Sequence, residues 1–380
     1  MSALLTYPEE FLQASKGYWT AKEITQQPQI WRQAYANVEA KRAQLNTWLT
    51  PLLAQENLRI ILTGAGTSAY VGDAIAPHLT TSTQRVFEAI STTSIVSNTQ
   101  QYLLKNVPTL LISYGRSGNS PESVAAINLV NEVVDNCYHL VITCNPDGEL
   151  ATSAITADNA FSLIMPEGTL DQSFAMTSSY TSMMVSTLAI FSPQAEQLEI
   201  AAKWTENFLN NNVEKLKTQS LQPTERLVFL GSGGLQGIAR EAALKVLELT
   251  SGQILSYCES PLGFRHGPKS LMNGNTEVIV LASSNEYTKL YDQDLITELR
   301  RDNQALAITV LDKDFFGQTD TLDDVWAALP YIVYCQTLAF FKSMQANISP
   351  DNPCPTGEVN RVVQGVTLYP LSNDRAKKCA

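Results

Sequence analysis

One pattern occurs twice in this chain: a run of apolar, β-forming residues that leads directly into a glycine turn. The first copy is RIILTGAGT, which begins at Arg59, and the second is RLVFLGSGG, which begins at Arg226, 167 residues later. The runs TLLISYGRSG from Thr109 and TEVIVLASSN from Thr276 keep the same offset, and a third pair, LVITC and LAITV, departs from it by one residue. Three pairs of runs in nearly the same register indicate a duplicated domain.

Each copy alternates apolar strands with helical segments, of which residues 120–135 and 235–250 are the clearest. This alternation is typical of an α/β fold, in which helices cover both faces of a parallel sheet. Ligands of such sheets bind at the carboxyl ends of the strands. The glycine turns are therefore the first places to look for a binding site.

The segments outside the two copies complete the predicted organisation. Residues 1–50 are expected to form a helical arm, because apolar residues recur there at helical spacing, namely Trp31, Tyr35, Val38, Leu45 and Trp48. The first domain is expected over residues 51–217 and the second over 218–343, with a helical connection between them. Residues 344–380 form a tail rich in Pro, Asn and Gly, and long irregular segments of this kind are often functional.

Charge, cysteine and histidine contents restrict the class of function. The 380 residues carry 26 Lys and Arg against 37 Asp and Glu, a net charge of −11, which argues against a broad surface for nucleic acid or acidic membranes. The six cysteines are scattered without a CxxC pair, as expected for reduced thiols, and three histidines are too few for a histidine-rich metal site. No leader peptide and no apolar run of membrane-spanning length is recognisable. We therefore expect a cytoplasmic protein that binds neither nucleic acid nor membrane.

The first glycine turn, residues 64–68, follows a strand and opens a helix. Its backbone N–H groups and the hydroxyls of Thr67 and Ser68 would converge at the positive end of that helix, where a phosphate group binds well. Nucleotide binding is the weaker interpretation, because neither a complete GxGxxG motif nor a following Gly-Lys-Ser/Thr is present. A plain tight turn with Thr67 or Ser68 as helix cap explains this motif alone equally well.

A second turn, residues 113–123, strengthens the phosphate interpretation. Ser117 and Ser120 surround a predicted helix start, with Pro121 at the first helical position. Their hydroxyls and bare N–H groups, with Arg116 beside them, would surround an oxyanion. A capped loop without a ligand, and a surface salt bridge for Arg116, are the alternatives. The position of this turn in the same half as the first favours phosphate.

A charged stripe lies on the predicted helix 235–250. Glu241, Lys245 and Glu248 follow at i, i+4 and i+7, so their side chains share one face. Ala, Leu and Val flank them, so the helix is expected to be buried on most sides, with its charges pointing into a pocket or an interface. Carboxylates in such places can act as general bases. On the pattern alone, an ordinary i,i+4 pair of Glu241 with Lys245 is the better interpretation.

His266 lies in FRHGPK, where Gly267 and Pro268 exclude a regular helix and hold the imidazole on a loop. Histidine titrates near neutral pH, which suits sugar ring opening or a proton relay. His139, in a predicted strand, and His78, in a predicted helix, are expected to serve packing. A lone loop histidine is more often structural than catalytic, so a catalytic role for His266 is inferred only from its context.

Taken together, these motifs carry a family resemblance. The chain resembles the double-SIS (sugar isomerase) proteins in TGAGTSAYVGD, SYGRSGNSPESV, FAMTSSYTSMM, LGSGGLQGIAREAALKVLEL and GFRHGPKSL. More closely, it resembles the AgaS-type galactosamine-6-phosphate deaminase/isomerases, also called tagatose-6-phosphate ketose/aldose isomerases, over almost its whole length. The resemblance implies two tandem SIS domains, each a five-stranded parallel sheet sandwiched by helices. It also implies a homodimer with active sites shared between subunits.

The resemblance assigns roles through the related isomerase domain of glucosamine-6-phosphate synthase. In that domain the phosphate is held by the two turns of the first SIS domain. The matching positions of this chain are Thr67, Ser68, Arg116, Ser117 and Ser120. A Lys-x-x-Glu motif matches Lys245 and Glu248, which implies that Glu248 moves a proton between sugar C2 and C1. An HGP motif matches His266, which implies ring opening by an imidazole that reaches in from the neighbouring subunit.

Two departures from the synthase bear on the chemistry. The synthase ends in a lysine near the sugar carbonyl, whereas this tail offers Arg361 and only a distal pair, Lys377 and Lys378. Arginine does not readily form an imine, so we expect Arg361 to act as an electrostatic aid. Met176 stands where the synthase has serine, so sugar contacts there are expected to differ.

The expected reaction converts D-galactosamine 6-phosphate to tagatose 6-phosphate and ammonia. No metal or redox cofactor is expected, because the protonated imine and enamine carry the charge. Plain aldose/ketose isomerisation of a hexose 6-phosphate, and deamination of glucosamine 6-phosphate, use the same proton chemistry and stay open as alternatives. A phosphosugar-sensing regulator is the alternative from another class, and the acidic chain without a basic helix-turn-helix argues against it. The second-half glycine turn, residues 231–234, is expected to serve close helix packing.

Overall fold

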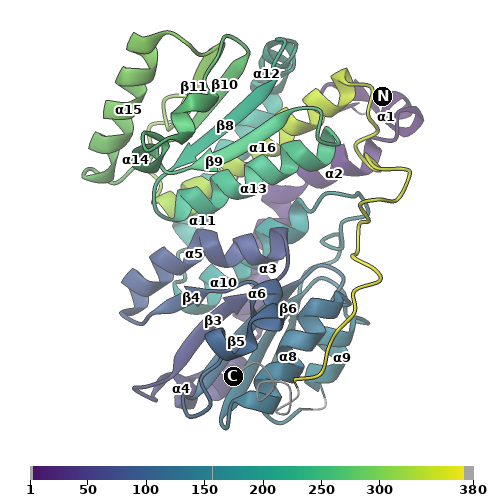
Figure 1. Cartoon of the computed structure of the whole chain (residues 1–380), viewed down its shortest axis with the longest axis vertical. Helices are drawn as coiled ribbons and strands as arrows, with labels where there is room; N and C mark the ends of the chain where they lie inside the picture. The colour runs from purple at the N-terminus through teal and green to yellow at the C-terminus, as the bar shows by residue number, and fades with distance from the viewer. Residues whose placement is uncertain (1–2, 156, 372–380) are drawn as a thin grey trace, which may run out of the picture.

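The computed structural model describes residues 3–155 and 157–371 (Figure 1). Two α/β domains lie one above the other in this view, and each contains one parallel sheet. The first sheet has the order β4-β3-β5-β6-β7, with β3 (Arg59–Thr63), β4 (Phe87–Ala89), β5 (Thr109–Gly115), β6 (Cys137–Thr143) and β7 (Ala160–Ile164). Every residue of β5 is buried, as expected for the central strand of a parallel sheet that is covered on both faces.

Helices cover both faces of the first sheet because its strands alternate their side chains. Ile60 and Leu62 of β3 join the main core beneath α5 (Thr67–Thr83) and α10 (Ser178–Phe191). Ile61, between them, joins a second cluster with α6 (Thr92–Ser97) and α8 (Pro121–Val133). The short helices α7 (Thr99–Tyr102) and α9 (Glu149–Ile155) complete this domain.

The second sheet repeats this arrangement with one strand fewer. Its order is β11-β10-β8-β9, with β8 (Arg226–Gly231), β9 (Leu255–Glu259), β10 (Thr276–Leu281) and β11 (Ala307–Leu311), all parallel. The expectation of five strands is therefore wrong for this domain within the described chain. Residues 312–323, after β11, contain several Asp and no Val or Ile, and they lead directly into the next helix instead of a fifth strand.

The helices of the second domain are α13 (Gly234–Leu249), α14 (Pro261–Phe264), the 3-10 helix Pro268–Leu271, α15 (Thr288–Asp302) and α16 (Asp324–Gln345). The two copies of the repeat superpose in register: Arg59 pairs with Thr109 in the first sheet, and Arg226 pairs with Thr276 in the second. Both glycine turns also use a glycine at positive φ, 56° at Gly66 and 58° at Gly233. The duplication predicted from the sequence is confirmed.

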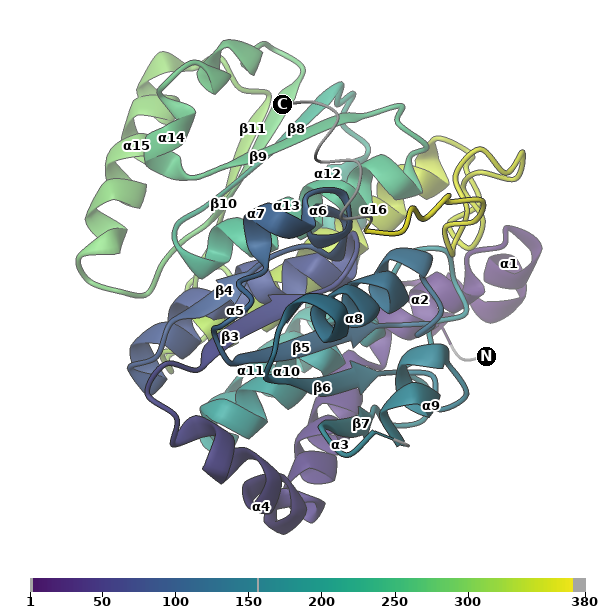
Figure 2. The same cartoon turned by 60° about the horizontal axis from the view of Figure 1, so that its bottom comes forward.

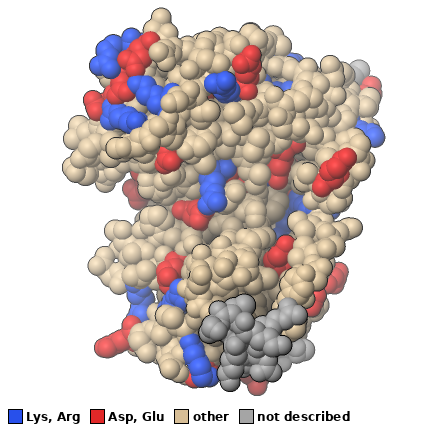
Figure 3. All heavy atoms as spheres, viewed as in Figure 1, with Lys and Arg blue, Asp and Glu red and all other residues tan. Residues whose placement is uncertain are grey.

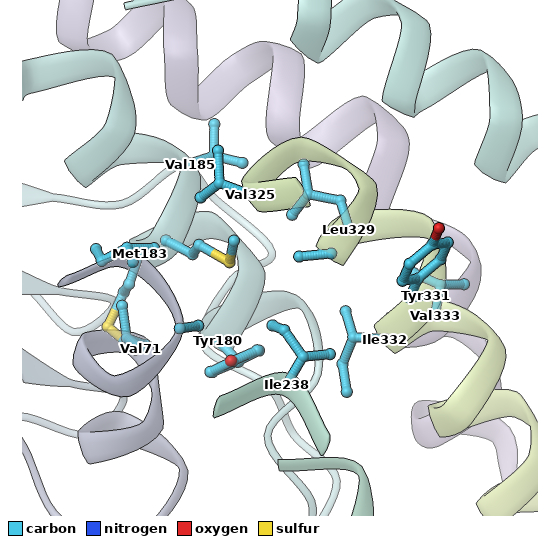
Figure 4. Packing of buried hydrophobic residues seen from close by; sticks show 14 of the residues in the cluster. Val71, Tyr180, Met183, Val185, Ile238, Val325, Leu329, Tyr331, Ile332 and Val333 are labelled. Atoms are coloured by element: carbon cyan, nitrogen blue, oxygen red, sulfur yellow. The ribbon is translucent and has the colours of Figure 1, made fainter. Parts of the chain in front are cut away.

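The two domains share one core, in which α5 and α13, the equivalent helices of the two copies, cross each other (Figure 1). Gly237 makes this crossing close, because a Cβ there would lie 2.5 Å from the backbone nitrogen of Ala74. Figure 4 shows Tyr180 and Met183 near this crossing, with Ile238 and Ile332. Each fully buried side chain of this size stabilises the fold by roughly 1.5–3 kcal/mol.

The N-terminal arm packs on this core. It consists of a small hairpin, β1 (Ala3–Leu4) and β2 (Tyr7–Pro8), and of α1 (Glu9–Ala14), α2 (Tyr18–Thr25), α3 (Gln27–Ala40) and α4 (Arg42–Leu53). The predicted apolar stripe is present, since Trp31, Val38 and Leu45 are fully buried. The Nε1 of Trp31 donates to the Oγ1 of Thr181 in α10, 2.8 Å away. The arm is thereby tied to the first domain.

The connection and the tail complete the chain. Two helices, α11 (Ala195–Asn211) and α12 (Val213–Ser220), form the predicted helical connection. After α16 the tail runs as an irregular strap across the first domain (Figures 1 and 2), and Thr367 to Leu371 lie beside α6 and α7. Lys377 and Lys378 lie outside the described residues.

The surface mixes charges of both signs. On the face in Figure 3, Lys and Arg lie in small groups beside Asp and Glu. One such group joins α14 to α15, where Arg265 and Lys269 share the carboxylate of Glu298. None of the helices in the described part of the chain is both long and apolar enough to cross a membrane.

Candidate active site

A cavity of about 250 Å³ opens where β3 and β5 end, and the two glycine turns of the first domain form its floor. Residues from α13 and from the tail close its sides. Seven of the nine residues predicted from the sequence line it, namely Thr67, Ser68, Arg116, Ser117, Ser120, Glu248 and Arg361. Segments that are far apart in the chain are thus brought together at the edge of the sheet where ligands of α/β folds bind.

The floor presents two helix N-termini. Gly66, with φ of 56°, turns the chain into α5, and Gly64 leaves room for that turn, because a Cβ there would lie 2.6 Å from the backbone of Ser68. The second helix, α8, begins at Pro121, and the side chain of its N-cap residue, Ser120, makes no capping hydrogen bond. The positive ends of both helices and a free hydroxyl therefore face the cavity, which suits an anion.

The other two serines are also positioned to bind a ligand. Ser117 is fixed through its carbonyl, which accepts from the Nδ2 of Asn145 at 2.8 Å. The hydroxyl of Ser68 contacts only the Sδ of Met176, at 3.8 Å, and a thioether is a weak acceptor. A phosphate oxygen would replace this contact at little cost.

Arg116 lines the cavity, but its guanidinium is committed to carbonyl groups. It donates to Phe174 at 2.9 Å, to Ser173 at 3.4 Å and to the carbonyl of Arg361 at 2.8 Å. Burial, together with the charge of Arg361, lowers its pKa from the ordinary value of an arginine. The surface salt bridge that was the alternative is absent among the described residues. The side chain thus shapes the cavity wall, and its charge adds a positive field.

Arg361 holds the tail against the same wall. Its Nε donates to the carbonyl of Ser173 at 3.1 Å, and its Nη2 donates to the carbonyl of Asp171. Both arginines therefore bind the segment of residues 171–176, here called the site loop. Phe174 and Met176 of the site loop line the cavity as well.

The residues predicted to carry the acid/base chemistry lie on α13. The side chains of Glu241 and Lys245 are fully buried, and that of Glu248 is 21% exposed at the cavity. The Nζ of Lys245 contacts the Glu248 carboxylate, and it lies 3.0 Å from the Oγ1 of Thr67 and 3.3 Å from the Oε1 of Glu241. Lys245 thus joins the predicted base to the first glycine turn, although it does not itself line the cavity.

Burial and charge act in opposite directions in this cluster. Desolvation favours the neutral form of Lys245, but Glu241 and Glu248 together raise its pKa, so it stays an ammonium. Desolvation raises the pKa of Glu241 to about 8, against the attraction of Lys245. Neither oxygen of Glu241 makes an aligned hydrogen bond, and its Oε1 lies 3.3 Å from the Nζ of Lys245. The simple i,i+4 pair that the pattern favoured is present, but it is part of this cluster.

His266 is the predicted catalytic residue that the structure does not bring to the cavity. It follows α14 and is exposed, and it is not among the lining residues. Its backbone N–H donates to the carbonyl of Gly263 at 2.9 Å, which fixes the loop. The other two histidines serve packing, as predicted: His139 is buried in β6 beside Asn131, and His78 contacts the hydroxyl of Ser192.

Sequence reasoning missed several contributors. Glu122 and Ser123, in the first turn of α8, line the cavity, and one carboxyl oxygen of Glu122 is buried without a partner. An acid at a helix start looks like an ordinary dipole partner in sequence, so no signal distinguished it. Glu23 of the arm was missed as well, although it contacts the site loop.

The second-half glycine turn does serve packing. A Cβ at Gly234 would lie 2.3 Å from the carbonyl oxygen of Ala74, so α13 can approach α5 only with glycine there. Ser232 in this turn donates to the carboxylate of Asp292 at 2.7 Å, and the hydroxyl of Ser283, after β10, donates to Asp324 at 2.5 Å. Carboxylates of the chain itself therefore occupy the donors that would hold an anion in the second domain.

No group of three or more His, Cys, Asp or Glu within residues 3–155 and 157–371 is arranged to hold a metal ion. The residues that line the cavity supply hydroxyls, helix N-termini and the carboxylate of Glu248, which the ammonium of Lys245 contacts from behind the cavity wall. These groups suit a small phosphorylated ligand and proton transfer.

Comparison with known proteins agrees with this geometry. The chain is 53% identical over 374 residues to the D-galactosamine-6-phosphate deaminase AgaS of Shewanella sp. (strain ANA-3), with 97% of this chain and 96% of the relative covered. It is 48% identical over 372 residues to the protein of the same name from Escherichia coli, with 94% and 97% covered. The crystal structure of tagatose-6-phosphate ketose/aldose isomerase from Escherichia coli matches with a TM-score of 0.87 and 46% identity, over 94% of this chain and 98% of that one.

The family model named SIS domain matches residues 52–193 and 220–347, which contain the two sheets. The duplicated strands, the two glycine turns and the α13 cluster all lie within these ranges. The chain therefore belongs to the SIS domain family and carries two SIS domains in tandem.

Proposed function

We propose that this protein is a D-galactosamine-6-phosphate deaminase/isomerase, which releases ammonia and forms tagatose 6-phosphate. The observation that carries the proposal is the Lys245–Glu248 pair at a cavity whose floor consists of two helix N-termini and serine hydroxyls. The names of relatives 53% and 48% identical to the chain support this substrate.

The phosphate is held at the floor of the cavity. Ser68, Ser117 and Ser120 donate their hydroxyls, and the N-termini of α5 and α8 add backbone N–H groups and positive dipoles. Arg116 contributes charge from the wall. The sugar carbons C1 and C2 then lie toward α13.

Glu248 moves the proton. Its carboxylate removes the proton from C2 of the open-chain aldehyde while a proton of the C2 ammonium group passes to the carbonyl oxygen, which gives an enaminol, and Glu248 then returns its proton to C1. The product of this step is a protonated imine at C2. Water adds to the imine carbon and ammonia leaves, so that C2 becomes the ketone of tagatose 6-phosphate. The sugar's own nitrogen supplies the imine, so the reaction needs no lysine in the tail.

Lys245 orients the Glu248 carboxylate. Its ammonium contacts Glu248, and through Thr67 it is tied to the turn that holds the phosphate. Arg361 is bound to carbonyls of the site loop and acts as a positioning residue with a favourable charge.

The proposal includes a homodimer with shared sites. His266 is exposed, and it belongs to a rigid loop between α14 and a 3-10 helix. An exposed imidazole is available to the cavity of a second copy, where it would open the pyranose ring. We further propose a cytoplasmic enzyme of amino-sugar catabolism that acts as a hydrolase in the imine step, without nucleic acid or membrane partners. The domain limits 51–217 and 218–343, with the arm 1–50 and the tail 344–380, are part of the same proposal.

A comparison of substrates tests the function. Galactosamine 6-phosphate and glucosamine 6-phosphate are supplied in parallel with chelator present, and ammonia is measured. Rapid release from the galacto sugar is expected, with slower release from the gluco epimer. Release from the gluco sugar alone would overturn the substrate, and interconversion of tagatose 6-phosphate without any ammonia from either amino sugar would reveal a plain isomerase.

A further inference from the structure

The arm carries a buried glutamate that reaches the site. Glu23 lies on α2, is 3% exposed, accepts from the backbone N–H groups of Gln172 and Ser173, and shares a hydrogen bond with the hydroxyl of Ser173. A buried carboxyl group is costly unless its oxygens are hydrogen-bonded, and here both oxygens have partners. The partners all belong to one end of the site loop.

The site loop connects Glu23 to the arginines of the cavity wall. The carbonyl of Ser173 accepts from Arg116 and from Arg361, whereas its N–H and hydroxyl bind Glu23. The other end of the loop is fixed separately, because the carboxylate of Asp171 accepts from the backbone N–H groups of Thr177 and Ser179 at 2.8 and 2.9 Å. Glu23 is thus an external support of the segment that holds both arginines, beside the carbonyl of Asp351, which accepts from the backbone N–H of Phe174 at 3.2 Å.

We propose that Glu23 is a positioning residue for substrate binding, which fixes the site loop and through it Arg116, Arg361 and the tail wall of the cavity. The inference rests on the proposed function only for the identity of the substrate. Its physical content is that a residue of the arm, outside both SIS ranges, sets the shape of the phosphosugar cavity.

The protonation of Glu23 decides which variant preserves the contact. Burial and the charge of Asp171 raise the pKa of Glu23 to about 8, so it is protonated at neutral pH. The Ser173 hydroxyl can then accept from Glu23 and donate to the carbonyl of Ala175, 3.0 Å away. A glutamine can make the same pattern, with its oxygen toward Gln172 and its amide N–H toward Ser173.

The experiment compares Glu23→Ala, Glu23→Gln and a matched control in the full-length protein. The control is Gln27→Ala, since Gln27 is fully buried in the same arm and its side chain bonds Thr181 and Gln336, away from the site loop. For Glu23→Ala we expect KM for galactosamine 6-phosphate to rise roughly tenfold, the scale expected when hydrogen bonds to a buried carboxyl are lost. We expect kcat to change much less, because Glu248 lies on α13. Glu23→Gln should restore KM at pH 7, and Gln27→Ala should lower thermal stability without raising KM.

Hydrogen exchange of the free protein provides a readout that does not depend on the substrate. In Glu23→Ala, faster exchange is expected in residues 171–176 and also in residues 359–363 of the tail, and in neither segment of Gln27→Ala. If exchange stays unchanged in the tail, or if Gln27→Ala raises KM as much as Glu23→Ala does, the positioning role is overturned. If the unaltered protein turns over no amino-sugar phosphate, the proposed function falls, and the exchange pattern still decides the role of Glu23.

Discussion

At the scale of single residues, the site depends on one buried ammonium that serves two purposes. Lys245 is fully buried between Glu241 and Glu248 and also contacts Thr67, at the floor of the cavity. The sequence could predict these residues, because Glu241, Lys245 and Glu248 share a helix face at fixed spacing. It could not predict that Arg116 would bind carbonyls, because its partners lie 57 and 58 residues away, and 245 residues away in the tail.

Glu248→Gln tests the base at this scale. The amide keeps the shape of the side chain but cannot take the C2 proton, so kcat should fall by roughly 10²–10⁴, the usual contribution of a general base. Glu132→Gln, which alters an exposed glutamate near the end of α8, is the control and should retain full turnover. Steady-state ammonia release measures both. Near-normal turnover of Glu248→Gln would remove the residue from its role.

At the scale of elements, the positions of helices were easier to predict than the number of strands in a sheet. The expected helices 120–135 and 235–250 correspond to α8 (Pro121–Val133) and α13 (Gly234–Leu249), because glycine or serine and proline mark where they begin. The fifth strand of the second domain was inferred from the family resemblance, and the polar segment 312–323 does not supply it. Contacts between α2 and the site loop join residues 150 apart, which no local pattern reveals.

The contact between α2 and the site loop also predicts how stability depends on pH. The native state keeps Glu23 protonated up to a pKa of about 8, whereas an unfolded chain releases this proton near its ordinary value of about 4.5. As pH rises, ionisation of Glu23 therefore stabilises the unfolded state before it can stabilise the native state. The contribution of Glu23 to the free energy of unfolding is full below pH 4.5 and is lost as pH rises to about 8. Glu23→Gln removes the titration, so urea unfolding from pH 5 to pH 8.5 should show a flatter pH dependence than the unaltered protein. An identical slope in both would contradict a raised pKa.

At the scale of the whole molecule, the two copies of the repeat differ in the groups that meet their turns. In the first domain the side chain of Ser120 makes no capping hydrogen bond, while in the second domain Asp292 and Asp324 accept from the hydroxyls of Ser232 and Ser283. The second domain contributes α13 instead, and His266 is not among the residues that line the cavity of its own chain. The sequence repeat predicted the two domains, but only the fold shows that the first domain forms the floor of the cavity and the second contributes α13.

Subunit mixing tests the shared site. Glu248→Gln and His266→Asn should each be nearly inactive alone. If His266 serves the neighbouring cavity, a hybrid dimer carries one site with both defects and one intact site. Random co-assembly of equal amounts should then restore about a quarter of the normal activity, because half of the dimers are hybrids. No recovery in co-expressed protein of confirmed hybrid composition would place His266 outside the shared site.

The central claim is that one cavity both moves the C2 proton and releases the amino group. The most direct test is to measure ammonia and tagatose 6-phosphate together during turnover of galactosamine 6-phosphate. One ammonia per tagatose 6-phosphate is expected, and both products should fall by the same factor in Glu248→Gln. Ammonia without tagatose 6-phosphate, or ammonia release that survives in Glu248→Gln, would contradict the account.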